Sequence, residues 1–161
     1  MKYQIFDYID SVDVRYILQN PWSLTASEWP LGDDTQLDES LRWINKKLEL
    51  CQKDGFITIW KTTEGQAIAL LGFYMVGIKK YETFFVASSH MDAHAIKISI
   101  DLRKILKEKE STQYQGCTCR LYSASLHPKQ VDWFKFIGFT YLPKQNIGNN
   151  RCFEYKSISE I

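Results

Sequence analysis

Two histidines of the 161-residue chain have a spacing that could hold a metal ion. His90 and His94 stand four residues apart, which places both imidazole rings on one face of a helix. A helical zinc protease also needs a glutamate directly after the first histidine, and this chain has Met91 there. The sequence therefore predicts no metal site and two ordinary histidines.

The four cysteines show no metal or redox pattern either, since no Cys-x-x-Cys pair is present. Cys117 and Cys119 lie two apart in a strand-like run, so their side chains share one face as buried apolar residues do. We expect reduced thiols, as in a cytoplasmic protein.

Composition excludes two classes of partner. The formal net charge of +1 gives no electrostatic reason to bind nucleic acid or an anionic membrane. The longest apolar run, 67–77, is about half as long as a membrane-spanning helix, and the first residues lack the apolar stretch of a secretory signal. The length suits one domain over residues 1–161, which we expect in the cytoplasm.

Changes in hydrophobic period mark the elements that would position any site. Leu37, Leu41 and Ile44 begin a helical repeat that Thr35 is expected to cap and Gly55 to end in a left-handed conformation. Ser11 is expected to cap a shorter helix. Strands are predicted at 3–8, 56–62, 67–78, 81–87, 117–125, 139–142 and 151–156, and helices at 11–20, 35–55, 92–108 and 127–137, with a loop or broken helix at 22–32.

The helix predicted at 92–108 carries apolar residues on two sides. Ile98 and Leu102 share one side, while Ile96 and Ile100 project from the other. Such a helix is expected between two layers. Because it separates the strands 81–87 and 117–125, these should be parallel neighbours.

The predicted order is β-α-α-β-β-β-α-β-α-β-β. It describes an α/β (α+β) fold with a mixed, largely antiparallel central sheet flanked by helices. That order resembles the GNAT N-acetyltransferase family over nearly the whole chain. The run Phe134-Lys135-Phe136-Ile137-Gly138-Phe139 is similar to the family's Tyr-x-x-x-Gly-Phe ending of the last helix. Any amphipathic helix with a glycine stop would show part of this pattern. Ile98, Leu102, Phe134, Ile137 and Phe139 are expected in the core.

The resemblance implies acetyl-CoA as cofactor, with its pyrophosphate at the start of the helix 92–108. The family places a glycine-rich run there, so that backbone N–H groups approach the phosphates closely. Here the stretch has no glycine, and Asp92, best explained as the helix N-cap, adds a repelling carboxylate. Weak binding of acetyl-CoA, or none, is predicted. The positions that correspond to the cofactor contacts are Val86, Ser88, Ser89, His90, Ala93 and Ala95.

The resemblance also implies two proton-transfer roles. The family's general acid is a tyrosine four residues before the helix-ending glycine, where this chain has Phe134, which has no proton to donate. Tyr122 and Tyr141 are the candidate replacements, and Phe134→Tyr should restore a donor that water in the cleft satisfies. Glu82 is the candidate base, with a solvated surface carboxylate as the alternative.

Two hypotheses of function remain open. In one, the chain is a divergent acyl-CoA-dependent N-acetyltransferase acting on a small amine, a protein N-terminus or a lysine. In the other, it is a non-enzymatic phage protein that uses the scaffold to bind other phage proteins. The second rests on a resemblance of 84–89, 97–109 and 134–139 to small GNAT-like internal virion or morphogenesis proteins of short-tailed phages, which lack the glycine-rich loop. A ligand-sensing domain is a third alternative.

Overall fold

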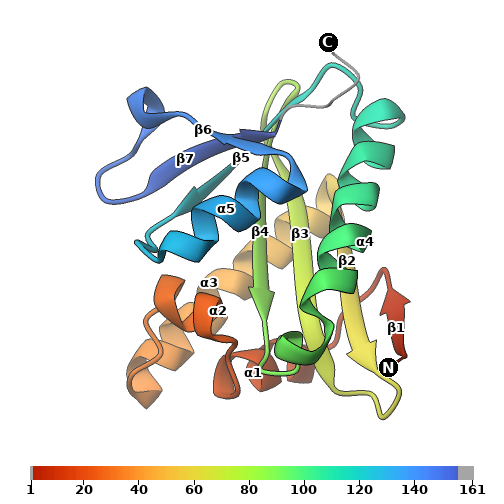
Figure 1. Ribbon diagram of the computed structural model, residues 1–161, viewed down its shortest axis with the longest axis vertical. Helices are drawn as coiled ribbons and strands as arrows, with labels where there is room; N and C mark the ends of the chain where they lie inside the picture. Colours follow the sequence, from red (N-terminus) through yellow and green to blue (C-terminus); the bar gives the residue numbers. More distant parts are fainter. Residues whose placement is uncertain (1, 156–161) are drawn as a thin grey trace.

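One seven-stranded sheet organises the computed structural model, which describes residues 2–155 (Figure 1). The strands follow the order β1-β2-β3-β4-β5-β7-β6. Their bounds are β1 (Tyr3–Phe6), β2 (Gly55–Thr62), β3 (Ala67–Gly77), β4 (Lys80–Ala87), β5 (Thr118–Ser123), β6 (Phe139–Tyr141) and β7 (Arg151–Tyr155). Every neighbouring pair is antiparallel except β4 and β5, which are parallel. The predicted fold class and the parallel pair are confirmed.

Helices cover both faces of the sheet. α1 (Ser11–Gln19) and α3 (Asp34–Lys53) bury their apolar sides against β2, β3 and β4 from one face. α4 (Met91–Ser111) and α5 (Pro128–Ile137) pack on the opposite face, together with residues of the short α2 (Ser23–Glu28). A 3-10 turn, η1 (Pro143–Gln145), lies between β6 and β7. Because the long apolar strands alternate their side chains between the faces, they supply both cores.

The helix ends differ in detail from those predicted. α1 is capped by Asp10, whose N–H donates to the Asp13 carboxylate (3.1 Å), and not by Ser11. α3 is capped by Asp33, whose Oδ1 accepts from the N–H of Gln36 (2.8 Å), and not by Thr35. Aspartate serves as well as serine or threonine in this position, so an adjacent aspartate moves the start by a residue or two.

Gly55 has a different role from the one predicted. It does not end α3 as a left-handed residue; Asp54 is the C-cap and Gly55 opens β2. A Cβ at this position would lie 1.8 Å from the backbone oxygen of Phe73. Close approach of two strands therefore explains this glycine.

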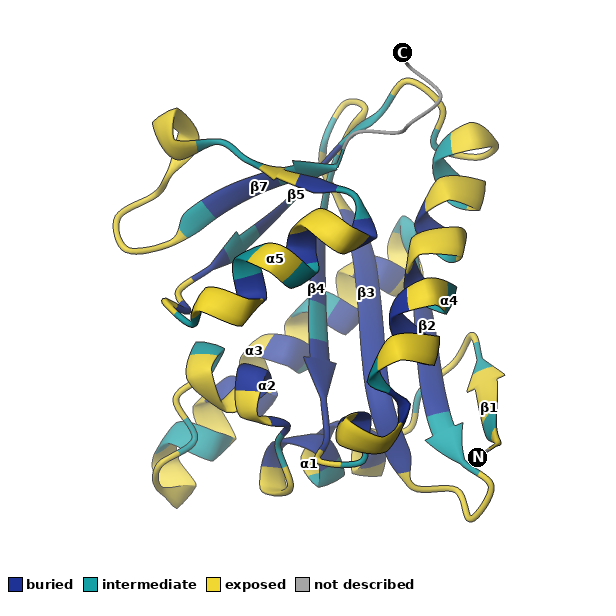
Figure 2. Cartoon of the chain, viewed as in Figure 1, coloured by how far each residue is buried: buried dark blue, intermediate teal, exposed yellow. Residues whose placement is uncertain are grey.

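The expectation that α4 lies between two layers is wrong. Its inner side is buried as predicted, including Ile98 and Leu102. Ile96 and Ile100, however, are 81% and 39% exposed, and no second layer covers them among the described residues (Figure 2). α4 therefore leaves two isoleucines on the surface.

The junction of α5 and β6 confirms the predicted glycine stop. Gly138 ends the helix with φ of 115°, a left-handed conformation, and its N–H bonds back to the carbonyl of Phe134. Phe139, the next residue, is 2% exposed and packs edge-on against Tyr155. Phe134 and Ile137 are buried too, so the predicted core on this side is confirmed.

Candidate functional site

The sheet divides where its two parallel strands meet. β4 and β5 pair only over 80–82 and 118–120, after which β5, β6 and β7 diverge from the longer sheet (Figure 1). The second halves of β4 and β5 leave a gap that α5 crosses on one side. A gap between diverging parallel strands is where ligands of α/β proteins commonly bind.

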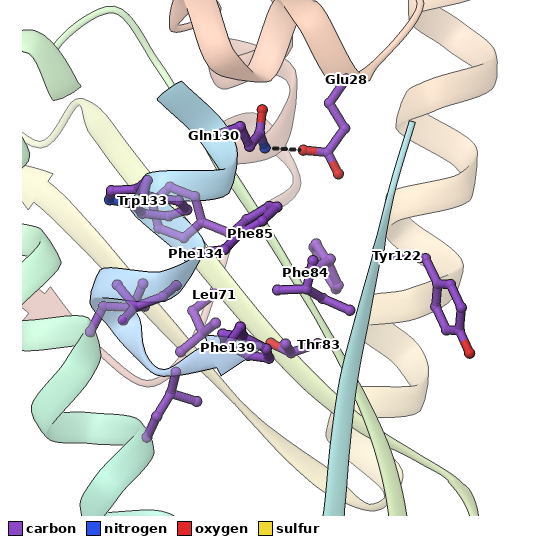
Figure 3. Close-up of a pocket in the computed structure, with 14 residues that line it drawn as sticks. Glu28, Leu71, Thr83, Phe84, Phe85, Tyr122, Gln130, Trp133, Phe134 and Phe139 are labelled. Atoms are coloured by element: carbon purple, nitrogen blue, oxygen red, sulfur yellow. Dashed lines mark hydrogen bonds between the residues drawn. The ribbon is translucent and has the colours of Figure 1, made fainter. Parts of the chain in front are cut away.

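Aromatic side chains fill this gap. Phe85 of β4 packs on Trp133 with ring centroids 4.9 Å apart, and Phe134 packs on Phe153 of β7 at 4.7 Å. The cavity that remains has a volume of about 30 Å³ (Figure 3). That is room for roughly one water molecule. The gap is therefore closed by side chains.

The gap divides the sheet into two arms, β1–β4 on one side and β5–β7 on the other. A strap formed by residues 20–28 joins these two arms. On the β4 arm, the N–H of Trp22 donates to the carbonyl of Ala87 (2.9 Å), and the N–H of Ala87 donates to Thr25 Oγ1 (2.9 Å). On the other arm, Ser27 Oγ bonds Ser125 Oγ at 2.8 Å. The strap thus uses backbone groups at the end of β4 that point away from β3.

The loop from β4 into α4 also uses its own backbone donors. From residue 87 to 93, six of the seven N–H groups donate within the chain. Ser88 and Ser89 donate to the carbonyls of Ile68 and Asn20, both at 2.8 Å. The six bonds run from Ala87 to Thr25, Ser88 to Ile68, Ser89 to Asn20, Met91 to Ser88, Asp92 to Ser89 and Ala93 to His90. A phosphate placed here would have to displace these bonds.

Two side chains near the start of α4 are held by aromatic residues. Tyr16 stacks on His90 and its hydroxyl lies 2.7 Å from His90 Nε2. Trp22 Nε1 donates to the carboxylate of Asp92 (3.1 Å). The prediction that Asp92 is the N-cap is wrong, because His90 occupies that position and Asp92 stands in the first turn.

The other predicted cofactor positions lie at the same end of the sheet. Val86 and Ser88 are fully buried in the sheet and the loop, and Ser88 Oγ donates to the carbonyl of Ala67 (2.7 Å). Ala93 is exposed on the first turn of α4, while Ala95 packs against the core. The structure therefore brings these positions together but gives several of them internal partners.

The predicted base and one predicted acid share a second cavity. Glu82 and Tyr122 line a hollow of about 300 Å³ on the other face of β4 and β5, with Arg120 and Glu154 beside them, and Tyr122 also borders the small cavity of the closed gap. Glu82 accepts a hydrogen bond from Tyr74 (3.0 Å), and Arg120 pairs with Glu154 (3.0 Å). In Figure 3, Tyr122 lies across the β5 ribbon from Phe134.

Tyr141, the other predicted acid, lies apart from both cavities. It stands on β6, where its ring packs on Phe153 and its hydroxyl accepts from Asn146 (2.9 Å). The structure thus brings Glu82 and Tyr122 together and separates them from Tyr141.

One pair of polar residues at the closed gap was not predicted from the sequence. Glu28, at the end of the strap, accepts a hydrogen bond from Gln130 Nε2 of α5 (2.9 Å; Figure 3). Burial raises the pKa of Glu28 to about 7, and hydrogen bonds from Gln130 and Ser123 oppose this only in part. Gln130 is 3% exposed, and within residues 2–155 its Oε1 has no hydrogen-bond partner.

The described part of the chain contains neither a metal-ligand cluster nor a membrane-spanning helix. No group of three or more histidine, cysteine or acidic side chains is arranged to hold a metal ion between residues 2 and 155. Over the same residues, no helix is long and apolar enough to span a bilayer.

Comparison with known proteins identifies the fold. No protein-family model and no curated protein sequence matches the chain. Solved structures do match over almost their full length. The PaiA N-acetyltransferase of Thermoplasma acidophilum, solved with coenzyme A, is 14% identical with a TM-score of 0.64, covering 97% of this chain and 99% of that one.

Two further structures give the same result. The aminoglycoside 6'-acetyltransferase type Ii is 18% identical with a TM-score of 0.58, and the match covers 98% of this chain and 97% of that one. A chimera of spermidine N-acetyltransferase SpeG from Vibrio cholerae is 15% identical with a TM-score of 0.59, covering 99% and 98%. At these identities the likeness establishes architecture alone. The chain has the GNAT fold of the N-acetyltransferases.

Proposed function

We propose that this chain is an acetyltransferase-like protein that no longer binds acyl-CoA at the family's position and keeps the GNAT scaffold to bind a protein partner. One observation carries the proposal: the backbone groups at the end of β4 and the start of α4 are occupied by the strap and by the loop itself. A pyrophosphate needs such N–H groups free.

The size of the closed gap supports the same proposal. A cavity of about 30 Å³ remains between the arms. Small-molecule sites usually measure roughly 300–1,000 Å³. Opening this one would require Trp133 and Phe134 to leave the core. The residues present therefore do not fit coenzyme A.

The nature of the partner follows from the second resemblance. The segments 84–89, 97–109 and 134–139 resemble GNAT-like proteins of short-tailed phages that serve in virion assembly. We include in the proposal that the chain is phage-encoded and that its partner is another phage protein.

Titration with acetyl-CoA tests the loss of cofactor binding. By calorimetry we expect no measurable heat up to about 1 mM ligand, a binding free energy weaker than about −4 kcal/mol. An active GNAT acetyltransferase measured in the same buffer is the positive control. A low-micromolar dissociation constant, or a crystal with coenzyme A on the N-terminus of α4, would overturn the proposal.

A second candidate function is acyl-CoA-dependent acetylation of a small amine, a protein N-terminus or a lysine. The hollow that Glu82 and Tyr122 share with Lys80, Arg120 and Glu154 favours it. Arg120 already pairs with Glu154, but Glu82 has no ion-pair partner within residues 2–155 and could receive an amine. Among the neighbours, SpeG acts on spermidine and the type Ii enzyme on aminoglycosides. Steady release of thiol from acetyl-CoA with a panel of amines would establish this function in place of the first.

Phe134→Tyr distinguishes the two functions at the position of the missing acid. The expectation that water would satisfy the new hydroxyl is corrected by the structure, since Phe134 is 3% exposed beside a cavity for about one water. We expect a loss of stability of about 1–2 kcal/mol from the poorly satisfied hydroxyl. We also expect no thiol release from either protein. A gain of about 10²-fold or more over wild type would show that acyl-CoA reaches this residue.

A further inference from the structure

The outer side of α4 and the end of α5 enclose a groove that neither candidate function uses. The groove has a cavity volume of about 360 Å³, and its floor is formed by Ile137, Gly138 and Phe139. Its walls carry Arg103, Lys107, Lys135 and Phe136. Arg103 lies twelve residues after the start of α4, about 18 Å along the helix axis from the loop that resembles the pyrophosphate site.

Three cations line this groove without an acidic partner among the described residues. Arg103, Lys107 and Lys135 are exposed, and none of them forms an ion pair within residues 2–155. No carboxylate from residues 2–155 lines the groove; Asp132, one turn before Phe136 on α5, lies outside the lining. The groove is therefore a local basic site on a chain whose net charge is only +1.

Apolar surface continues from the groove along α4. Ile96, Ile100, Arg103 and Lys107 recur at steps of four and three, so they form one stripe on the outer side of the helix. The two isoleucines and Phe136 are 81%, 39% and 44% exposed. Arg103 lies over the Phe136 ring at 5.5 Å from its centroid. Exposed aromatic residues beside arginine are enriched at protein interfaces.

We infer that this stripe and groove form the docking surface for an acidic, amphipathic helix of a partner protein. Its carboxylates would pair with the three cations, and its apolar residues would cover Ile96, Ile100 and Phe136. A helix fits because the stripe runs along a helix and presents apolar and basic groups in the same direction. The inference rests on the proposed function, in which the scaffold binds a partner, and adds the surface and the chemistry of that partner.

A labelled peptide tests the docking surface directly. The probe is a fluorescein-labelled helix of about 18 residues, five turns, with leucines at every third or fourth position among glutamates. Fluorescence anisotropy should show binding that weakens at high salt. Arg103→Glu with Lys135→Glu should lower the affinity at least about tenfold. Phe136→Ala should lower the affinity for the peptide about threefold or more, at high salt as well as at low salt, because the contact that Phe136 makes is apolar.

Three controls keep the result specific. Lys46→Glu, at an exposed position of α3, should change the affinity less than about twofold. Circular dichroism and thermal unfolding must show that each variant is folded. In wild type, amide chemical-shift changes caused by the peptide should cluster at 96–107 and 135–140, which does not depend on any variant.

Other outcomes overturn the inference. Unchanged binding by the charge-reversal variant, shift changes elsewhere, or tighter binding of an oligonucleotide than of the peptide would each do so. The acetyl-CoA titration separates this result from the proposed function. If acetyl-CoA binds and the peptide also binds in the groove, only the proposed function is overturned. If neither acetyl-CoA nor the peptide binds, only the docking surface is overturned.

Discussion

Replacing Phe139 by alanine is expected to lower the free energy of unfolding by about 3–5 kcal/mol. Phe139 is 2% exposed, lies in the core between α4, α5 and β7, and packs edge-on against Tyr155 at 5.5 Å. Truncation removes a phenyl ring from a site whose neighbours are fixed by the sheet and by the left-handed turn at Gly138, so the cavity cannot collapse fully. Urea unfolding followed by circular dichroism measures the change.

Phe136→Ala is the matched control for this prediction. Phe136 stands three residues earlier, on α5, and is 44% exposed, so its loss should cost less than about 1 kcal/mol. A typical domain has a total stability of about 5–15 kcal/mol, so the Phe139 variant should unfold at a clearly lower urea concentration. If the two variants were equally stable, Phe139 would not be the core residue that the fold requires.

The fold could be predicted from the sequence because its main signals are local. The apolar stripe of α3 recurs within each turn, and the long apolar strands β3 and β4 are separated by a short turn. The parallel pair then follows from the helix between β4 and β5. The predicted N-caps, Ser11 and Thr35, were wrong by one or two residues. An aspartate precedes each of them, Asp10 and Asp33, and aspartate caps a helix as well as serine or threonine does.

The outer side of α4 shows where a local pattern is insufficient. Isoleucines at 96 and 100 look alike whether a second layer covers them or solvent does. Single apolar residues are common on protein surfaces, so composition does not distinguish the two cases. Only the position of α5 relative to α4 reveals that these residues adjoin a basic groove.

The candidate site was harder to predict because its closing contacts are nonlocal and many involve the backbone. The absence of glycine at the start of α4 could be read directly, and so could Phe134 in place of tyrosine. The strap binds the backbone of Ala87 through the N–H of Trp22 and the hydroxyl of Thr25, both more than 60 residues away in the sequence. The Glu28–Gln130 bond spans 102 residues. No spacing in the sequence signals such contacts.

Wild type is expected to lose stability between about pH 4.5 and pH 7, and Glu28→Gln is expected to abolish this fall. Burial raises the pKa of Glu28 from 4.5 to about 7, so over this range the folded protein keeps a proton that the unfolded chain has released. Stability then decreases as the pH rises through this window and is constant above it. At about 1.4 kcal/mol per pH unit, with allowance for water at this partly exposed residue, the fall is about 2–3 kcal/mol.

The variant should match wild type near pH 4.5 and exceed its free energy of unfolding by about 2–3 kcal/mol at pH 8. Glutamine retains the shape of the side chain and can still bond Gln130, whose Oε1 lacks a partner in the described part of the chain. Urea unfolding at intervals from pH 4.5 to 8 measures the difference between the two proteins, which removes the contribution of all other titrating groups. Glu49→Gln, at an exposed position of α3, is the control and should leave the pH profile unchanged.

The same experiment tests whether the gap between the arms is closed in solution. If the strap were detached, Glu28 would be in water, and Glu28→Gln would have no more effect than Glu49→Gln at any pH. A pH-dependent gain confined to Glu28→Gln requires the carboxyl to be buried against α5, which holds only while residues 20–28 bridge β4 and α5. Because that bridge occupies the backbone of Ala87, the pH profile of Glu28 and the failure of acetyl-CoA to bind should occur together.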